Sequence, residues 1–405
     1  MKTLFKHKVN RSHGVELKRI SQKMRILKAI FFNGPLSNAE LAKKIALSTP
    51  MINNLLVELI EDNLIVDLGT GDSSGGRPPN IYGLVEDGFY VVGISIGVHS
   101  TGIAIFNSNN KEVVPAKYFP VKIQSNISIF SKINSLLEGI IKEAGIDRNK
   151  IVVGGIEMPG LVDYKNGVNR TYFPGYNNLY EVLNKVFEFR VYFENDTKVR
   201  TFAEQHFGLA KGRQNVLVVQ TGWGVGLGLI LNGHLYRGKT GYSGEFGHLP
   251  IVENGILCKC GKKGCLETIA SATAIARIAK EGILSGNPSL INELVDNNIE
   301  KIDTSIVIRA AHTGDQFAIS VLAEVGHWLG RGIAFLIQIF NPELIIINGN
   351  AAEAFQFMMA PIQQAIHTYS NHDISNDTEI EISKLGSKAG IQGAAALALE
   401  KITEI

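Results

Sequence analysis

Apolar residues near the start of the chain recur at helical spacing and predict three short helices. The apolar face of the first has i, i+3, i+4 spacing and consists of Met24, Leu27, Ile30 and Phe31. Asn33-Gly34-Pro35 predicts the end of this helix. Ser37-Asn38-Ala39-Glu40 has the pattern of a capping box, so a second helix begins there. The third helix has N-cap Ser48, C-cap Asn63 and an apolar face made of Ile52, Leu55, Leu56, Leu59 and Ile60.

These helices and the segment after them favour a winged helix-turn-helix. Two capped helices joined by a short turn are typical of a helix-turn-helix, whose last helix enters the major groove of DNA. Segments 64–67 and 80–84 have strand character, and the glycine-rich run 69–79 between them predicts a hairpin, the wing. The alternative is a three-helix domain that contacts another protein.

The outward positions of the third helix supply candidates for DNA recognition. Asn53 and Asn54 can read adenine, and Thr49 lies on the same outward face. The third helix has no Lys or Arg, so phosphate contacts fall to Lys43, Lys44 and the basic segment 1–28, which holds nine Lys or Arg and one acid. Arg77 at the wing tip suits the minor groove. A solvated tail is the alternative for the basic segment.

From residue 90 onward the pattern changes to alternating strands and helices. Strands are predicted at 91–97, 101–106, 112–120 and 150–156, with a helix at 129–144 before the last of them. A similar series restarts after Asn215, with strands at 216–220, 226–231 and 233–236. Two series of like order predict an α/β fold with mixed sheets, duplicated into two lobes with a cleft.

Composition narrows the class of protein. Of the 405 residues, 45% are hydrophobic and 19% charged, which is typical of a globular chain, and the net charge is only +2. Three cysteines do not suffice for a disulfide scaffold and fit a reducing compartment. The sequence contains no apolar run of transmembrane length and no apolar segment after the basic start, so we expect a cytoplasmic protein without a membrane partner.

One histidine and all three cysteines form a metal-ligand pattern, His248-x9-Cys258-x-Cys260-x4-Cys265. Three thiolates and one imidazole complete a tetrahedral set for zinc and leave no open position, so the predicted zinc is structural. Three unrelated reduced thiols are the alternative.

Carboxylates near this pattern suggest recognition of a polyol. Asn195-Asp196 follows a predicted strand at 190–193, and an amide beside a carboxylate suits hydroxyl groups, with the Asp also a candidate general base. Glu245 and Glu267 flank the metal loop, and a metal on His248 would fix both around one pocket. The alternatives are a turn or helix cap at Asn195-Asp196 and simple solvation of the two glutamates.

Taken together, these residues resemble the ROK family of repressors, open reading frames and sugar kinases. The strongest signals are Glu-x-Gly-His at 245–248, Cys-x-Cys-Gly-x-x-Gly-Cys-x-Glu at 258–267 and Asn-Asp at 195–196. Weaker matches lie at 158–163, 174–179, 341–343 and 393–395. Gly-Gly-Arg-Pro at 75–78 resembles the repressor branch.

The resemblance implies an actin-like ATPase fold of two lobes, a zinc held by one His and three Cys, and a sugar in the cleft. It places the sugar contacts at Asn195, Asp196, Glu245, His248 and Glu267. The implied organisation is a basic arm at 1–20, a winged helix at 21–86, a first lobe at 87–200 with a returning helix at 388–405, and a second lobe at 201–387 with the zinc loop and a dimerisation surface.

The ATP-side motifs depart from those of the kinase members. Asp196 falls on the kinase base, but Ser95 replaces the Asp of the first phosphate loop, Trp223 occupies the second, and Asn348-Gly349-Asn350 replaces Gly-Gly-Gly. Asp196 is therefore expected to be a vestigial base rather than a catalytic residue.

These departures favour a sugar-responsive repressor of carbohydrate genes over an enzyme. We expect it to bind a pseudo-palindromic operator as a homodimer or homotetramer, with a sugar or sugar phosphate as effector. One alternative is an active ATP-dependent sugar kinase with an appended DNA-binding domain. Another is a regulator whose effector is a sugar-transport protein.

Overall fold

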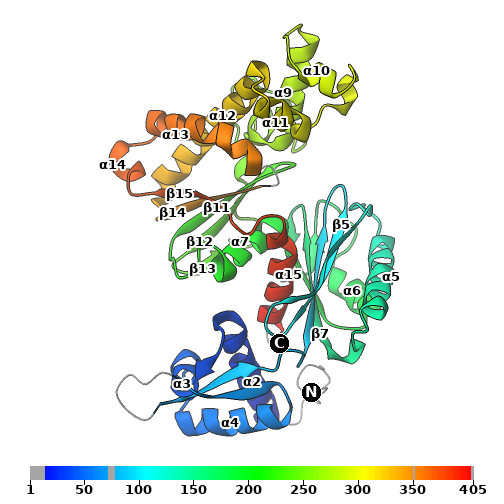
Figure 1. The fold of residues 1–405 in the computed structure, drawn as a ribbon, viewed down its shortest axis with the longest axis vertical. Coiled ribbons are helices and arrows are strands. Elements are labelled where there is room, and N and C mark those ends of the chain that lie inside the picture. The colour runs from blue at the N-terminus through cyan, green and yellow to red at the C-terminus, as the bar shows by residue number, and fades with distance from the viewer. Residues whose placement is uncertain (1–13, 72–77, 350–351, 403–405) are drawn as a thin grey trace. The chain divides into compact units, whose positions relative to one another are not determined.

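The computed structural model describes residues 14–71, 78–349 and 352–402 (Figure 1). The chain forms two compact units. The first contains the residues up to Val199 and those from Gly390 onward, and the second runs from Arg200 to Ala389. No helix in the described ranges has both the length and the apolar character that a membrane crossing requires.

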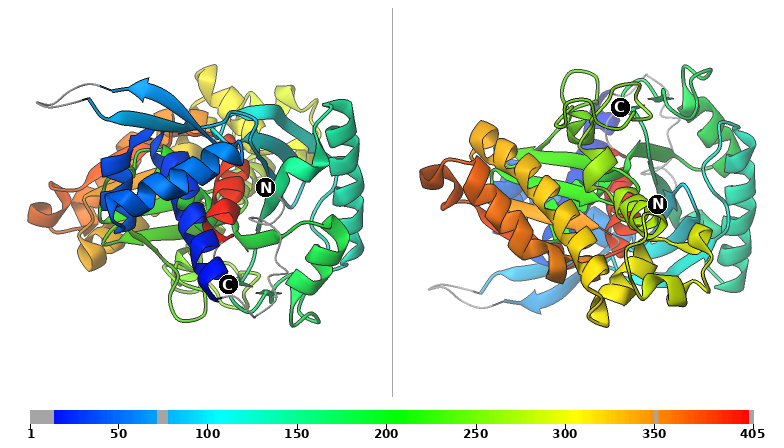
Figure 2. Two further views of the ribbon diagram at one scale, coloured as in Figure 1. Left: turned by 90° about the horizontal axis from the view of Figure 1, so that it is seen from below. Right: turned by 90° about the horizontal axis from the view of Figure 1, so that it is seen from above.

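A winged helix-turn-helix forms the start of the first unit, as the sequence predicts. Its elements are α2 (Gly14–Asn33), β1 (Leu36–Ser37), α3 (Asn38–Ile45), α4 (Thr49–Glu61), β2 (Ile65–Thr70) and β3 (Asn80–Leu84). The strands pair antiparallel in the order β1-β3-β2, and the hairpin β2–β3 extends away from the three helices (Figure 2). Residues 72–77 of the predicted wing tip, including Arg77, lie outside the described residues.

The capping box that starts α3 is confirmed. The Ser37 hydroxyl accepts a hydrogen bond from the Glu40 amide at 3.2 Å, and the Glu40 carboxylate accepts one from the Ser37 amide at 2.8 Å. At the end of α4 the prediction is wrong by one residue. Asp62 is the C-cap, and Asn63 follows it with a φ of 56°, in the left-handed region that Asn tolerates.

The predicted apolar faces of α2 and α4 are buried, with one exception. The buried residues include Met24, Leu27, Ile30, Phe31, Ile52, Leu55, Leu56 and Leu59. Ile60 is 40% exposed, contrary to its predicted place in the core. It lies about 100° around the helix from Leu59, which takes it off the buried face.

Part of the predicted basic arm is helical and forms ion pairs within the domain. Helix α2 already begins at Gly14, within the arm expected at residues 1–20, and residues 1–13 lie outside the described range. The Arg19 guanidinium pairs with Glu58, and the Lys23 ammonium lies 3.0 Å from carboxylate oxygens of both Glu58 and Asp62. These two cations therefore hold α2 against α4, and their charge is partly neutralised.

The first unit continues with a five-stranded sheet. Its strands are β4 (Tyr90–Ile96), β5 (Thr101–Asn107), β6 (Glu112–Phe119), β7 (Ile151–Met158) and β10 (Val191–Asn195), in the order β10-β7-β4-β5-β6. Strands β10, β7 and β4 are parallel, whereas β5 and β6 are antiparallel to their neighbours.

Helices cover both faces of this sheet. Helices α5 (Ser128–Glu143) and α6 (Leu179–Phe187) lie on one face, and α15 (Lys388–Lys401) lies on the other (Figure 1; Figure 2). The backbone of α15 approaches the sheet so closely that a Cβ atom on Gly155 would lie 1.8 Å from the Ala394 carbonyl oxygen. Only glycine allows this approach, so α15 packs directly on β7.

The second unit contains another five-stranded sheet. Its strands are β11 (Val216–Thr221), β12 (Val225–Leu231), β13 (His234–Tyr236), β14 (Leu344–Gly349) and β15 (Glu379–Ile382), in the order β13-β12-β11-β14-β15. An apolar core joins this sheet to a set of helices, the principal ones being α9 (Ala272–Leu284), α11 (Thr304–His312), α12 (Gln316–Phe340) and α13 (Phe355–Tyr369). Helix α7 (Asp196–Phe207) spans the boundary between the two units.

The two sheets share one topology. In each, a hairpin of antiparallel strands follows the central strand, and two further parallel strands extend the sheet on the other side. Strand β4 thus corresponds to β11, and β7 corresponds to β14. The prediction of a duplicated mixed α/β fold after a winged helix is confirmed.

Candidate functional site

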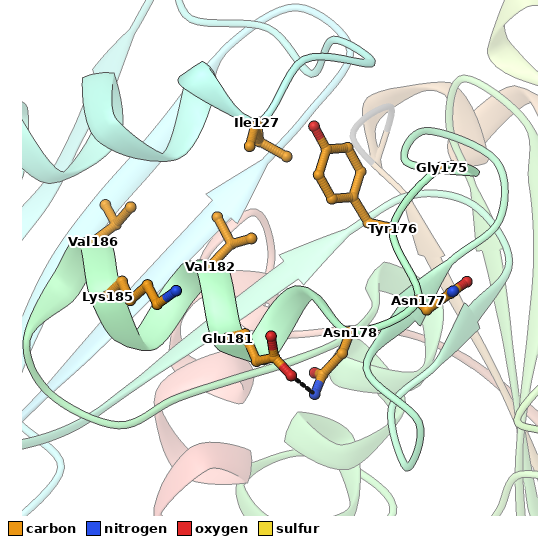
Figure 3. Close-up of a pocket in the computed structure, with 9 residues that line it drawn as sticks. All are labelled: Ile127, Gly175, Tyr176, Asn177, Asn178, Glu181, Val182, Lys185 and Val186. Carbon is orange, nitrogen blue, oxygen red and sulfur yellow. Dashed lines mark hydrogen bonds between the residues drawn. The ribbon is translucent and has the colours of Figure 1, made fainter.

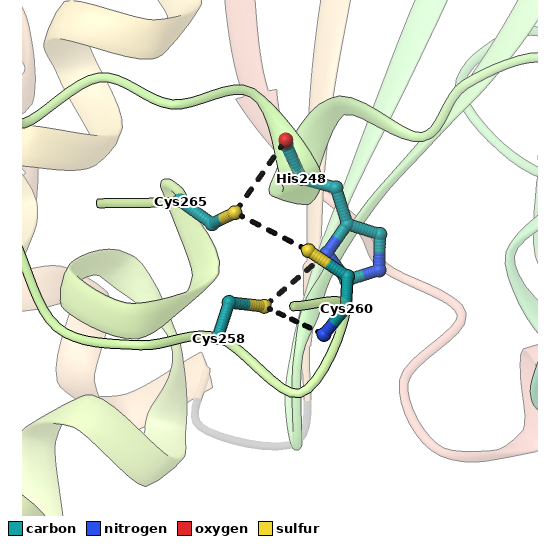
Figure 4. Close-up of side chains that lie close together, drawn as sticks. All are labelled: His248, Cys258, Cys260 and Cys265. Carbon is teal, nitrogen blue, oxygen red and sulfur yellow. Dashed lines mark hydrogen bonds between the residues drawn. The ribbon is translucent and has the colours of Figure 1, made fainter. Parts of the chain in front are cut away.

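The four predicted metal ligands converge on one point in the second unit. Their ligand atoms, from His248, Cys258, Cys260 and Cys265, all lie within 4.8 Å of one another (Figure 4). Nδ1 of His248 lies 3.6 Å from Sγ of Cys258, and the sulfurs of Cys260 and Cys265 are also 3.6 Å apart. This set of donors can hold a metal ion.

Tight turns in the loop bring these ligands together. Short antiparallel bridges pair Pro250 with Cys265 and Leu257 with Lys263. Gly264 has a φ of 72°, and a Cβ atom there would lie 1.8 Å from the Val252 carbonyl oxygen, so this turn requires glycine. The loop thereby folds back on itself and places its three cysteines near His248.

A bound cation would change the protonation of these sulfurs. Burial raises the pKa of the Cys258 thiol to about 12, whereas a hydrogen bond from the Lys262 backbone lowers the pKa of the exposed Cys260 thiol. Coordination removes the proton from a thiol, so a bound metal would hold the buried sulfur as a thiolate at neutral pH.

Both predicted glutamates lie beside the metal ligands. Oε1 of Glu267, at the start of α8 (Glu267–Ala270), lies 3.5 Å from Nδ1 of His248 and accepts a hydrogen bond from the Cys258 thiol at 3.1 Å. Oε2 of Glu245 lies 3.8 Å from Nε2 of His248. Because Nδ1 faces the cysteine cluster, Nε2 is the imidazole atom on the Glu245 side.

Asn195 and Asp196 belong to the first unit, where β10 ends and α7 begins. The Asn195 amide group donates to the Gly160 carbonyl at 3.1 Å and to the Asp196 carboxylate at 3.0 Å, while its Oδ1 accepts from the Lys198 amide at 3.2 Å. The alternative interpretation as a helix cap is therefore correct for Asn195. These bonds also fix the Asp196 carboxylate at the carboxyl end of a parallel strand.

Tyr172 is a neighbour of Asp196 that the sequence analysis missed. Burial raises the pKa of its phenol, and the negative charge of Asp196 adds to that rise. The hydroxyl thus lies within electrostatic range of the predicted sugar contact. Only its position in the sequence just before the 174–179 loop could have pointed to it.

The positions at which the sequence departs from the kinase ATP motifs differ in their burial and hydrogen bonding. The Ser95 hydroxyl donates a hydrogen bond of 2.5 Å to Glu157, a buried residue on β7. Trp223 is 53% exposed at the turn between β11 and β12. Asn348 is buried at the end of β14, and Asn350 lies outside the described residues.

The candidate DNA contacts that lie within the described residues are exposed. Thr49, Asn53 and Asn54 are exposed on α4, and Lys43 and Lys44 are exposed in the last turn of α3. Exposure on α4 is the arrangement that a recognition helix requires.

A hollow of about 530 Å³ lies in the first unit, beside the 174–179 loop (Figure 3). Tyr176, from the loop, faces Ile127 at the start of α5, and Val182 and Val186 of α6 line the floor. Exposed polar side chains, Asn177, Asn178, Glu181 and Lys185, complete the lining. None of the predicted sugar contacts is among its lining residues.

Comparison with known proteins decides the family. The family model of the ROK family matches residues 91–401, and a model of winged helix-turn-helix DNA-binding domains matches residues 21–66. The chain belongs to the ROK family.

Among ROK relatives, the chain resembles both repressors and kinases. It is 27% identical to the xylose repressor of Bacillus spizizenii over 96% of this chain and 97% of that protein. It is 36% identical to the glucokinase of Thermotoga maritima, but over only 61% of this chain and 79% of the kinase. A crystal structure of a ROK family transcriptional regulator, a homologue of the Escherichia coli MLC protein, matches with a TM-score of 0.79 and 28% identity, covering 96% of this chain and all of that one.

Proposed function

We propose that this chain is a sugar-responsive transcriptional regulator, most simply a repressor of genes for carbohydrate uptake or breakdown. The observation that carries the proposal is the exposed helix α4, with Asn53 and Asn54 on its surface, in the same chain as a ROK metal loop flanked by two carboxylates. The match to repressors over nearly the whole chain supports it.

In this proposal the sugar contacts are Asn195, Asp196, Glu245, His248 and Glu267. Nε2 of His248 and the two glutamates offer hydrogen-bond partners for sugar hydroxyls, and Asn195 positions the Asp196 carboxylate. Asp196 would accept a hydrogen bond from a hydroxyl without removing its proton for phosphoryl transfer.

The expectation that the chain lacks kinase activity rests on Ser95. Kinase members place an Asp at this position to help hold magnesium and nucleotide, and a neutral hydroxyl is a poor ligand for magnesium. The Ser95 hydroxyl already donates a hydrogen bond to the Glu157 carboxylate. We therefore infer that the sugar is bound and left unmodified.

The metal is zinc in this proposal, held by His248, Cys258, Cys260 and Cys265. Soft sulfur donors with one imidazole match zinc, and four protein ligands leave no position for substrate. The ion would fix the turn that carries Glu245 and Glu267. It would supply structure rather than chemistry.

We also propose that the protein acts as a homodimer or homotetramer in the cytoplasm. Winged helices read operator half-sites in pairs, and a pair of domains requires at least two chains. A DNA partner and three reduced cysteines both fit the cytoplasm.

An ATP-dependent sugar kinase is the second candidate, because the glucokinase match has the higher identity over the region that it covers. A regulator that responds to a sugar-transport protein is the third. Two measurements distinguish the three candidate functions. The first is fluorescence anisotropy of the full chain on DNA from its own promoter region, with and without a panel of sugars. The second is an assay of ADP release with magnesium-ATP.

We expect salt-sensitive binding to the promoter fragment, a change of affinity with at least one sugar, and no ADP release. Sugar-dependent ADP release that Asp196→Asn abolishes would establish the kinase instead. DNA binding that ignores every sugar, and changes only with a transport protein, would establish the third candidate.

A further inference from the structure

The segment that joins the winged helix to the first lobe is held at several points. It comprises residues 85–89, between β3 and β4. Ser108, which is fully buried in the turn between β5 and β6, donates a hydrogen bond from its hydroxyl to the Glu86 carbonyl at 2.7 Å. The Lys150 ammonium donates to the Asp87 carbonyl at 2.8 Å. Linkers between domains usually make few contacts, so this one permits less movement than most.

A second contact joins the same two parts through α15. The ammonium of Lys28, in α2, donates a hydrogen bond to the Glu400 carbonyl in the last turn of α15, and it lies 3.8 Å from Oε2 of the Glu400 carboxylate. The Lys28 side chain is only 12% exposed, so salt and water screen this ion pair less than one at the open surface. The negative end of the α15 dipole also favours a cation at this place.

The end of α15 is itself fixed on the first lobe. The Arg190 guanidinium donates to the Ile402 carbonyl at 3.3 Å, and Nζ of the buried Lys401 lies 3.7 Å from the centre of the Tyr164 ring. Further along the helix, the backbone of α15 packs directly on β7. The last turn of α15 is therefore part of the lobe, whereas α2 is part of the winged helix. Two attachments on different elements remove the rotation that a single linker would allow.

We propose that the winged helix and the first lobe form one rigid block, held by Ser108 and by the Lys28–Glu400 pair, which transmits sugar binding to the DNA-binding helix. This inference rests on the proposed function and names the regulation of the sugar site. A movement of the first lobe would rotate α4 by the same angle, and two half-sites at a fixed spacing respond to such a rotation. A winged helix on a loose joint would reach its half-site whatever the position of the lobe, and the signal would be lost.

Three measurements on the full chain test the rigid block. Calorimetry with D-glucose, D-xylose and N-acetylglucosamine gives the sugar affinity. Fluorescence anisotropy on the promoter fragment, with and without each sugar, gives the change in DNA affinity. Hydrogen exchange in residues 85–90 reports on the joint without any ligand. The variants are Lys28→Gln, Lys28→Arg and Ser108→Ala, and the matched controls, at exposed positions on α5, are Lys142→Gln and Ser135→Ala.

In the unmodified chain, at least one sugar should change the DNA affinity by about fivefold or more, the usual size of coupling between two sites. Lys28→Gln and Ser108→Ala should lose most of this change, keep their sugar affinity, and show faster exchange in residues 85–90. Lys28→Arg should retain the change, because it keeps the positive charge and the N–H donors. Both controls should match the unmodified chain. If thermal unfolding shows that Ser108→Ala does not fold, Lys28→Gln decides the test.

An undiminished sugar response in Lys28→Gln would overturn the inference and leave the proposed function in place. Weaker DNA binding of Lys28→Gln without sugar, combined with a normal sugar response, would also overturn it, because Lys28 would then belong to the DNA interface. If no sugar alters the DNA affinity of the unmodified chain, the proposed function fails, and with it the role of the block in sugar sensing. Faster exchange in Lys28→Gln would still support the rigidity of the joint in that case.

Discussion

The side-chain amide of Asn38 donates a hydrogen bond to Oδ1 of Asn53, at 3.2 Å, between the first residue of α3 and the exposed face of α4. This bond links the two helices of the helix-turn-helix at the surface proposed to face DNA. It limits the orientations that the Asn53 amide can adopt, so Asn38 is a positioning residue for a proposed base contact.

Asn53→Ala should weaken binding to the promoter fragment by about 1–3 kcal/mol, because it removes a bidentate contact to a base. Asn38→Ala should cause a smaller loss. Fluorescence anisotropy with specific and scrambled duplexes measures both, and Val15→Ala, at an exposed position on α2, is the control. An equal loss on both duplexes would contradict base reading by Asn53.

Replacing Lys43 and Lys44 together by Gln should weaken binding to all duplexes alike. Each phosphate contact contributes about 0.9 to the slope of log affinity against log salt concentration, so the double variant should reduce that slope by up to about two. Lys111→Gln, an exposed lysine in the first lobe, is the control. An unchanged slope would exclude these lysines from the DNA interface.

Cys260→Ser should remove one zinc ligand and lower the metal content of the purified protein. Structural zinc contributes directly to folding, so the melting temperature should also fall, and a chelator should produce a similar fall in the unmodified chain. Elemental analysis and thermal unfolding measure these effects, with Lys262→Ser as the control. Full zinc occupancy in Cys260→Ser would contradict the proposed ligand set.

Glu245→Ala should reduce sugar affinity by about 1.5–3 kcal/mol, the value of a hydrogen bond to a charged group, and leave DNA affinity unchanged. Glu245 lies beside Nε2 of His248, whereas Glu253 is exposed elsewhere on the same segment, so Glu253→Ala is the matched control. Loss of DNA binding together with sugar binding would indicate a structural role for Glu245 instead.

Ser37→Ala should destabilise α3 by about 1 kcal/mol at neutral pH, because it removes the N-cap of the helix. Hydrogen bonds from Ser37 hold the pKa of Glu40 below its ordinary value of 4.5. A lowered pKa in the folded state stabilises the helix above the unfolded pKa, and this stability disappears as the pH falls through the folded value.

Hydrogen exchange of the α3 amides measures this effect. Protection in the unmodified chain should decrease as the pH falls through and below 4.5, whereas Ser37→Ala should start lower and respond less. Identical pH dependence in the two proteins would mean that the Ser37 hydroxyl does not lower the pKa of Glu40.

The sequence was a good guide where the relevant residues are close together along the chain. The capping box, the buried faces of α2 and α4, the strands of both sheets and the Cys258–Cys265 loop all follow from local spacing. Local pattern also produced the error at Ile60, because an apolar residue at the margin of a helix's apolar face can be either buried or exposed.

Contacts between distant residues could not be predicted in this way. Arg19 and Glu58 are 39 positions apart, and nothing in either local segment shows that they pair. The same is true of Ser95 and Glu157, which are 62 positions apart and meet because β4 and β7 are neighbours in the sheet. Asn195 was ambiguous for a different reason, since its amide caps a helix and orients a carboxylate at the same time.

The close packing of α15 on β7 has a consequence for biosynthesis. Strands β4 to β10 leave the ribosome long before residues 388–401 do, so one face of their sheet stays uncovered while almost half of the chain is still being translated. Shortened expression products that end before α15 would leave that apolar surface bare. They should accumulate as aggregates, because α15 completes the folding of the first lobe.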